Sequence, residues 1–263
     1  MDRFEHFLLT RFNVPNPDWM KDKNQNPVLD EEWLDHRFEI FEKFTLPSVA
    51  GQTNRKFTWL VFFDEETPGK YRYRISEYQV KCGNFKPVLV SDWKDYSQKL
   101  QGSLSSGIDK TQQYLLTSRL DNDDCIHREY IHDTQQAFRE EKRMVIDYPV
   151  GYALETGQKP EIRKRYRKFG HFISLVEAVE ADSPFETVLS RTHDEWSGTK
   201  SIELGDKAYW LEIIHEKNLL NKLQGDKVYS KSVLDPFSIQ VKISIPFVER
   251  IKPVVSSFIK KIK

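Results

Sequence analysis

Three acidic residues lie close together between Asp121 and Asp124, directly after the apolar part of the stretch LLTSRLDNDDCI at 115–126. Three neighbouring carboxylates repel one another unless a cation or solvent offsets their charge. On an extended chain residues two apart point the same way, so Asp121 and Asp123 could face one hard cation that also meets a diphosphate. The alternative is a solvated acidic turn, or carboxylates that cap a following helix. An EF-hand is excluded, because its obligatory glycine would be Ile126.

Strands and helices that alternate along the first half of the chain would position this cluster. The expected strands are 6–14, 57–64, 85–91 and the run that ends at residue 120, and the expected helices are 32–49 and 72–82. Pro47 should end or bend the last turn of the first helix. This alternation predicts an α/β fold with a mostly parallel central sheet flanked by helices. Ligands bind beyond the carboxyl ends of such strands, where Asp64, Ser91 and the acidic cluster fall.

The pattern changes after residue 142. We expect a helix at 127–142, short strands at 144–156, 166–180 and 186–193, and an apolar run passing into a polar helix at 207–223. The second half is therefore predicted to be more mixed than the first. With no internal repeat and no low-complexity linker, the pattern favours one domain with two subregions.

Composition narrows the class of protein. The 263 residues carry 40 Lys and Arg against 40 Asp and Glu, so the net charge gives no general reason to bind nucleic acid. Two cysteines are too few for a zinc cluster or a disulfide scaffold and favour a reducing compartment. The N-terminus is charged from its second residue, unlike a signal peptide, and no apolar run approaches the roughly 20 residues of a membrane span. We expect a cytoplasmic, globular protein.

The acidic cluster also carries a family resemblance. The run from Ser118 to Asp124 resembles the DxD region of GT-A-fold glycosyltransferases, in the form Arg, apolar residue, then Asp-x-Asp-Asp. Residues 38–64 resemble the first helix and second strand of that fold, with Leu-Pro-Ser-apolar and Gln-Thr before an apolar strand closed by Asp64. Together with HFLLTRFNV, FISLVEA and YWLEIIHEKNLLN, these segments are most similar to the rhamnosyltransferase family over roughly residues 6–225.

The resemblance implies a GT-A-like, Rossmann-like fold and a metal-dependent transferase. Its donor would be a nucleoside diphosphate sugar, with rhamnose as the family's sugar, and its acceptor a glycan or lipid-linked hydroxyl in surface polysaccharide synthesis. Manganese or magnesium would be the cofactor. The implied division is a transferase domain at 1–235, with a nucleotide-sugar-binding half at 1–125 and an acceptor and metal-closing half at 126–235, followed by a basic tail at 236–263.

By the same resemblance, the acidic residues take separate roles. Asp123 would be the direct metal ligand, Asp121 would contact the ribose or the metal, and Asp124 is a second candidate ligand. Arg119 would reach the donor diphosphate, since a guanidinium suits planar oxyanions. The alternative for Arg119 is a local salt bridge to Asp121 or Asp124.

Other positions complete the implied site. Thr10, Arg11 and Asp64 would line the nucleotide pocket at the ends of the first two strands. Asp194 or Glu195, about 70 residues after the cluster, would be the base that takes the acceptor's proton. The alternative for this pair is a surface turn.

Histidines and basic segments give further expectations. His215 would close the metal site, ahead of His193, because neutral imidazole is an acceptable ligand for manganese. The basic run at 163–168 could bind an anionic acceptor or lipid diphosphate, or form a solvated hairpin edge. The tail at 236–263 could dock on the core or make peripheral contact with the inner face of a membrane.

Two competing functions stay open at this point. A nucleotidyltransferase of similar fold should carry a Gly-rich phosphate loop after its first strand, where this chain has NVPNPDW. A non-catalytic, metal-dependent carbohydrate-binding or scaffold protein would keep the metal site and lack the base. Whether Asp194 or Glu195 can reach the sugar separates this last function from an enzyme.

Overall fold

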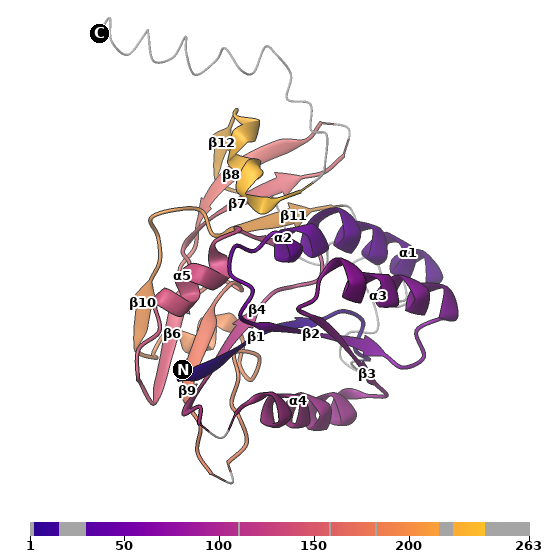
Figure 1. Cartoon of the computed structure of the whole chain (residues 1–263). Coiled ribbons are helices and arrows are strands. Elements are labelled where there is room, and N and C mark those ends of the chain that lie inside the picture. The colour runs from indigo at the N-terminus through magenta and orange to yellow at the C-terminus, as the bar shows by residue number, and fades with distance from the viewer. Residues whose placement is uncertain are drawn as a thin grey trace, which may run out of the picture.

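The computed structural model of the chain describes residues 3–15, 30–109, 111–157, 159–181, 183–215 and 223–239. The strands within these residues form two sheets (Figure 1). The polar helix expected after His215 falls largely at 216–222, and most of the basic tail falls at 240–263; both lie outside the described residues.

The first half of the chain alternates strands and helices as predicted. Its elements are β1 (Phe4–Arg11), α1 (Glu31–Ile40), the π-helical turn η2 (Phe41–Thr45), α2 (Leu46–Ala50), β2 (Thr58–Asp64), α3 (Gly69–Lys81), β3 (Phe85–Val90), α4 (Trp93–Gly107) and β4 (Tyr114–Arg119). Four of the described strands, β1 to β4, run parallel to one another in one sheet. Their carboxyl ends therefore meet at one edge of that sheet.

The central strands of the first sheet are buried on both faces. Along β1, Leu8 packs into the core cluster that faces α1 and α3, while Phe7 and Leu9 pack into the cluster that faces α4. Successive strand residues point to opposite faces, and helices cover both sides of the sheet in Figure 1. Double burial explains why β1 and β2 are continuous apolar runs in the sequence.

The helical segment from residue 31 to residue 50 continues through Pro47. Pro47 has no N–H to donate, and it lies in the first turn of α2, where that donor is not required. The wider turn η2 comes just before it, with the Leu46 N–H donating to the Phe41 carbonyl, five residues back. The predicted bend therefore appears as a π-helical turn.

The second half is more mixed, as expected. Its elements are β5 (Cys125–Ile126), α5 (Tyr130–Gln136), β6 (Arg143–Asp147), β7 (Val150–Glu155), β8 (Glu161–Tyr166), β9 (Ser174–Ala178), η3 (His193–Trp196), β10 (Ser201–Glu203), β11 (Trp210–Ile214), β12 (Asp226–Val228) and η4 (Lys231–Phe237). The first sheet has the order β10-β6-β9-β4-β1-β2-β3, and the second has the order β12-β8-β7-β11-β5. Trp210 of the second sheet packs in the same cluster as Leu8 of the first, so both sheets share one core. The predicted α/β fold class is confirmed.

Three expectations about elements need correction. Helix α4 was not predicted, and it buries Tyr96, Leu100 and Leu104 at a spacing of four residues. The helix expected at 127–142 is shorter, since α5 covers only Tyr130–Gln136. The strand expected at 186–193 is wrong: this segment forms turns, because the Glu177 carboxylate accepts the N–H groups of its first two residues.

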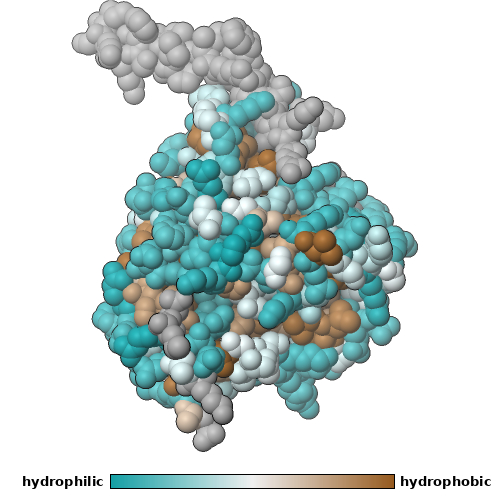
Figure 2. Space-filling model, in the orientation of Figure 1, coloured by the Kyte–Doolittle hydropathy of each residue, from teal (hydrophilic) through white to brown (hydrophobic). Residues whose placement is uncertain are grey.

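The face in Figure 2 is mostly hydrophilic, with apolar side chains gathered in small areas. Among the described helices, none has the length and apolar character needed to cross a membrane.

Candidate metal and sugar-transfer site

The acidic cluster forms a turn between β4 and β5. The Asp124 N–H lies 3.4 Å from the Asp121 carbonyl oxygen, which closes a four-residue turn. The expectation of an extended chain is therefore wrong here, and the alternation that would align Asp121 with Asp123 does not apply. A β-turn instead brings its first and fourth residues together. Asp121 and Asp124 become neighbours, and Asp123 is directed elsewhere.

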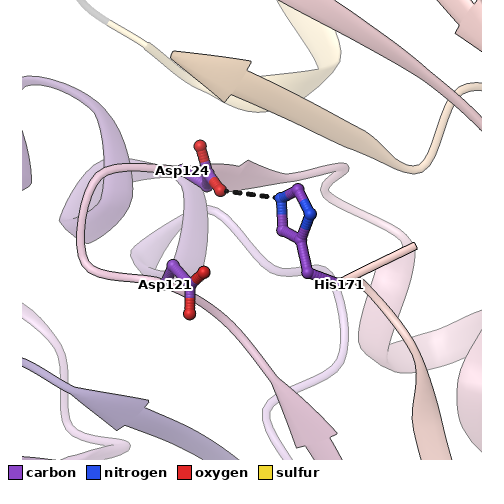
Figure 3. A group of neighbouring side chains, drawn as sticks. All are labelled: Asp121, Asp124 and His171. Atoms are coloured by element: carbon purple, nitrogen blue, oxygen red, sulfur yellow. Dashed lines mark hydrogen bonds and ion pairs between the residues drawn. The ribbon is translucent and has the colours of Figure 1, made fainter. Parts of the chain in front are cut away.

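Asp121 and Asp124 meet His171, a residue that the sequence interpretation missed. One ligand atom from each of the three side chains lies within 4.8 Å of the others, and the His171 Nε2 atom is 3.2 Å from Asp124 (Figure 3). His171 comes three residues before β9, which pairs antiparallel to β4 with Ser174 opposite Ser118. The chain therefore enters β9 at the edge where β4 ends. Two carboxylates and an imidazole form a donor set that suits manganese.

Asp123 is held in a buried ion pair. Its carboxylate accepts from Arg37 of α1 at 2.5 Å and lies 3.2 Å from the His215 Nε2 atom. Arg37 also donates to the side-chain oxygen of Asn122 at 3.0 Å. Burial alone would raise the pKa of Asp123, but Arg37 and His215 together hold it below its ordinary value. Asp123 and His215, both expected to bind the metal, thus contact each other.

Asp124 occupies the least favourable environment for a carboxylate in the turn. Burial raises its pKa to about 6, the charges of Asp123 and Asp121 add to that rise, and His171 opposes it. One carboxylate oxygen also accepts the Ile213 N–H at 3.0 Å. A carboxylate whose charge is disfavoured by burial and by like charges gains most from a bound cation.

Two arginines flank the turn at the carboxyl ends of β1 and β4. Arg119 donates two hydrogen bonds to Asp121, at 3.1 and 3.0 Å, so the local salt bridge considered for it is present. Asp121 is the main cause of the raised pKa of Arg119. Arg11 stacks over the Trp93 ring at 5.4 Å, and burial lowers the pKa of its guanidinium, with a further lowering from Arg119. Two guanidinium groups beside a carboxylate cluster can bind a diphosphate.

Thr10 and Asp64 make local contacts. The buried Thr10 hydroxyl donates to the Leu120 carbonyl at 2.8 Å and accepts the indole N–H of Trp59 at 3.0 Å. Asp64 ends β2, and its carboxylate accepts the Glu66 N–H at 2.8 Å. Asp64 is half-buried at the edge where Arg11 and Arg119 end their strands, whereas the Thr10 side chain points into the core.

The two candidate bases differ in what they contact. Glu195 accepts both the N–H and the hydroxyl of Thr192, at 2.8 and 3.0 Å, in a capping box at the start of η3. Asp194 is 76% exposed, and one of its oxygens is 2.9 Å from the His193 Nδ1 atom. The His193 ring lies 6.3 Å from the His171 ring. Both carboxylates are exposed, but Glu195 is engaged in the capping box and Asp194 is not.

Comparison with known families identifies the class of protein that this site serves. The family described as "Putative rhamnosyl transferase" matches residues 3–227. A rhamnosyl transferase moves a sugar, so the family is one of glycosyltransferases. The chain belongs to this family, which confirms the resemblance seen in the sequence. A search of curated proteins found no match.

Solved structures match the chain at low identity. The first 349 residues of S. aureus TarS in complex with UDP-GlcNAc are 15% identical, with 82% of this chain and 60% of that chain covered and a TM-score of 0.46. The same TarS fragment in complex with UDP is 14% identical, with 80% of this chain and 60% of that chain covered and a TM-score of 0.45. A nucleoside-diphosphate-sugar pyrophosphorylase from Vibrio cholerae RC9 is 9% identical, with 80% of this chain and 92% of that chain covered and a TM-score of 0.33. The chain spans about 60% of the TarS fragment's length, and the family match alone carries the assignment.

Proposed function

We propose that the protein transfers a sugar from a nucleoside diphosphate donor to an acceptor hydroxyl, with a divalent metal at Asp121, Asp124 and His171. The observation that carries this proposal is the gathering of three ligand atoms within 4.8 Å at the carboxyl edge of a parallel sheet. Ligands on opposite sides of a small divalent ion, each at about 2.1 Å, lie roughly 4.2 Å apart. The imidazole favours manganese over magnesium.

The acidic turn has the partners that a diphosphate site needs. A metal bound there would neutralise the donor phosphates and stabilise the leaving diphosphate as a Lewis acid. Arg119, oriented by its two bonds to Asp121, and Arg11 would bind phosphate oxygens from the strand side. The buried pair of Asp123 and Arg37 fixes the turn without using either side chain as a ligand.

Asp194 is the proposed base. It would take the proton of the acceptor hydroxyl as that oxygen attacks the anomeric carbon. Its exposure and its place beside His193 support this role, whereas the two hydrogen bonds from Thr192 to Glu195 favour a structural role for the latter. Rhamnose is the sugar that the family's description implies.

A donor panel tests the function. Purified protein is incubated with UDP-, GDP- and dTDP-linked sugars, including dTDP-rhamnose, and release of nucleoside diphosphate is followed with manganese and with EDTA. We expect release from one donor only when manganese is present. No release from any donor, together with no metal-dependent donor binding, would contradict the proposal. Formation of pyrophosphate from a sugar phosphate and a nucleoside triphosphate would instead indicate a nucleotidyltransferase.

A further inference from the structure

The basic run at 163–168 is mostly neutralised by the fold. Strand β8 and the turn after it carry five cations, and three of them form ion pairs with acids on the same or neighbouring segments. These pairs are Arg163 with Glu161, Arg165 with Glu212 and Lys168 with Glu203. Lys164 is exposed on the opposite side of β8 from Arg163. Arg167 differs from all of these, because it has no carboxylate partner among the described residues.

Arg167 is nevertheless held in one place. Its backbone N–H donates to the Pro149 carbonyl at 2.7 Å, and its side-chain stem lies against Gly170, close enough to contact a Cβ atom at that position. Its guanidinium is 3.3 Å from the His193 Nε2 atom. The His193 Nδ1 atom lies 2.9 Å from the Phe169 carbonyl, so Nδ1 carries the proton and Nε2 accepts from Arg167. A half-buried guanidinium is thus ordered before any ligand arrives.

Arg167 is close enough to Arg165 for their two positive charges to repel each other. Burial lowers the pKa of Arg165, and the charge of Arg167 lowers it further. Burial also lowers the pKa of His193; Asp194 opposes that shift, and Arg167 adds to it. His193 therefore stays neutral at neutral pH and brings no charge of its own. An anion at Arg167 would reduce the repulsion between Arg167 and Arg165.

Arg167 is linked to the proposed base through His193. Its partner His193 precedes Asp194 in the chain, and the two side chains are 2.9 Å apart. The His193 ring is 6.3 Å from the ring of His171, the proposed metal ligand. Arg11 and Arg119 belong to strand ends of the first sheet, whereas Arg167 follows β8 of the second sheet. Arg11 and Arg119 are the arginines proposed above for the donor diphosphate, which leaves Arg167 for the acceptor.

We propose that Arg167 binds an oxyanion of the acceptor, a phosphate or carboxylate group close to the hydroxyl that receives the sugar. The acceptor is then an anionic glycan or a phosphate-bearing molecule, and Arg167 selects it over neutral sugars. A guanidinium suits either group because it can donate two parallel hydrogen bonds to a planar pair of oxygens. This inference rests on the proposed function, since it uses Asp194 as the base and His171 as a metal ligand.

Inorganic phosphate is the first probe, with the seven histidine side chains as reporters. Imidazole NMR signals are followed while phosphate is added to metal-free wild type, Arg167→Gln and Lys164→Gln. Lys164 is an exposed cation on β8, the strand that Arg167 follows. We expect a saturable shift of the His193 signal in wild type and in Lys164→Gln, and an affinity at least 10-fold weaker in Arg167→Gln. Acetate in place of phosphate separates carboxylate from phosphate binding.

Two results would overturn the inference: no shift of His193 in wild type with either anion, or the same titration for Arg167→Gln as for wild type. The donor assay keeps this failure apart from failure of the proposed function. If only the acceptor inference is wrong, wild type still releases nucleoside diphosphate with manganese. If the function is wrong, no donor is turned over, whatever the phosphate titration shows.

Discussion

The acidic turn at 121–124 and the basic run at 163–168 look alike in the sequence, because each gathers charges of one sign. In the folded protein, the charged residues of each segment have different partners. Asp123 is paired with Arg37 and Arg165 with Glu212, and all four of these side chains are largely buried. Asp121, Asp124 and Arg167 are the members that fit a ligand: two converge with His171, and Arg167 has no acid partner among the described residues. Deep burial of the pair therefore separates Asp123 and Arg165 from the proposed ligand residues, even though Asp121 is also paired, with Arg119, in a more exposed salt bridge.

The largest effect should come from Asp124→Asn. Asparagine keeps the shape and an oxygen for the Ile213 N–H, and it removes the charge that a metal needs. We expect manganese-dependent turnover to fall by at least about 100-fold, since even residues behind metal ligands cost 10 to 100-fold. Release of nucleoside diphosphate measures this. The exposed Asp109→Asn is the control, and retention of a tenth or more of wild-type turnover by Asp124→Asn would break the comparison.

Arg37→Leu should mainly reduce stability. It removes the closest cation from the buried Asp123 carboxylate, which should cost about 3 kcal/mol. Arg163→Leu in the basic run breaks a more exposed pair with Glu161 and should cost about 1 kcal/mol or less. Urea denaturation gives both free energies of unfolding. Equal costs for the two variants would show that burial does not distinguish the two regions.

Asp194→Asn should lower kcat by about 100-fold, the usual contribution of a general base, with donor binding unchanged. Glu195→Gln should leave kcat within about threefold, because glutamine also serves in a capping box. Steady-state kinetics with one donor separate the two variants. A large loss of kcat in Glu195→Gln with normal turnover in Asp194→Asn would reverse the assignment.

The smallest effect is the pH dependence of stability that comes from His6. Burial lowers the pKa of His6 to about 3, and its neutral ring bonds to Ser118 at 2.8 Å. The unfolded chain takes up this proton below pH 6.5 and the folded chain does not, so stability falls as pH drops from 6.5 toward 3. Between pH 6.5 and 5 the His6 contribution should be about 2 kcal/mol. Urea titrations of wild type and His6→Gln at both pH values measure it; equal losses would contradict the assignment.

Local pattern was sufficient to predict the first half of the fold. Strands β1 and β2 are buried runs, strand β3 is buried at both of its ends, helix α3 has clear helical spacing, and the acidic cluster follows β4 as expected. Helix α4 was missed because only Tyr96, Leu100 and Leu104 mark its apolar face among serines and glycines. Ordinary patterning is a weak signal for such a helix.

The geometry of the site depended on contacts between distant segments. His171 joins Asp124 only because β9 pairs antiparallel with β4, a pairing that no local pattern encodes. The turn at 121–124 also placed Asp124, rather than Asp123, beside Asp121. The sequence therefore located the candidate site, and tertiary structure decided which members of the acidic cluster meet.

Manganese binding by two histidine variants tests the central claim most directly. Isothermal titration calorimetry of manganese into wild type, His171→Ala and His215→Ala compares the histidine beside Asp124 with the one beside Asp123. We predict that His171→Ala weakens manganese binding at least 10-fold and that His215→Ala changes it less than threefold. The reverse order, or equal affinity in all three proteins, would contradict a metal site at Asp121, Asp124 and His171.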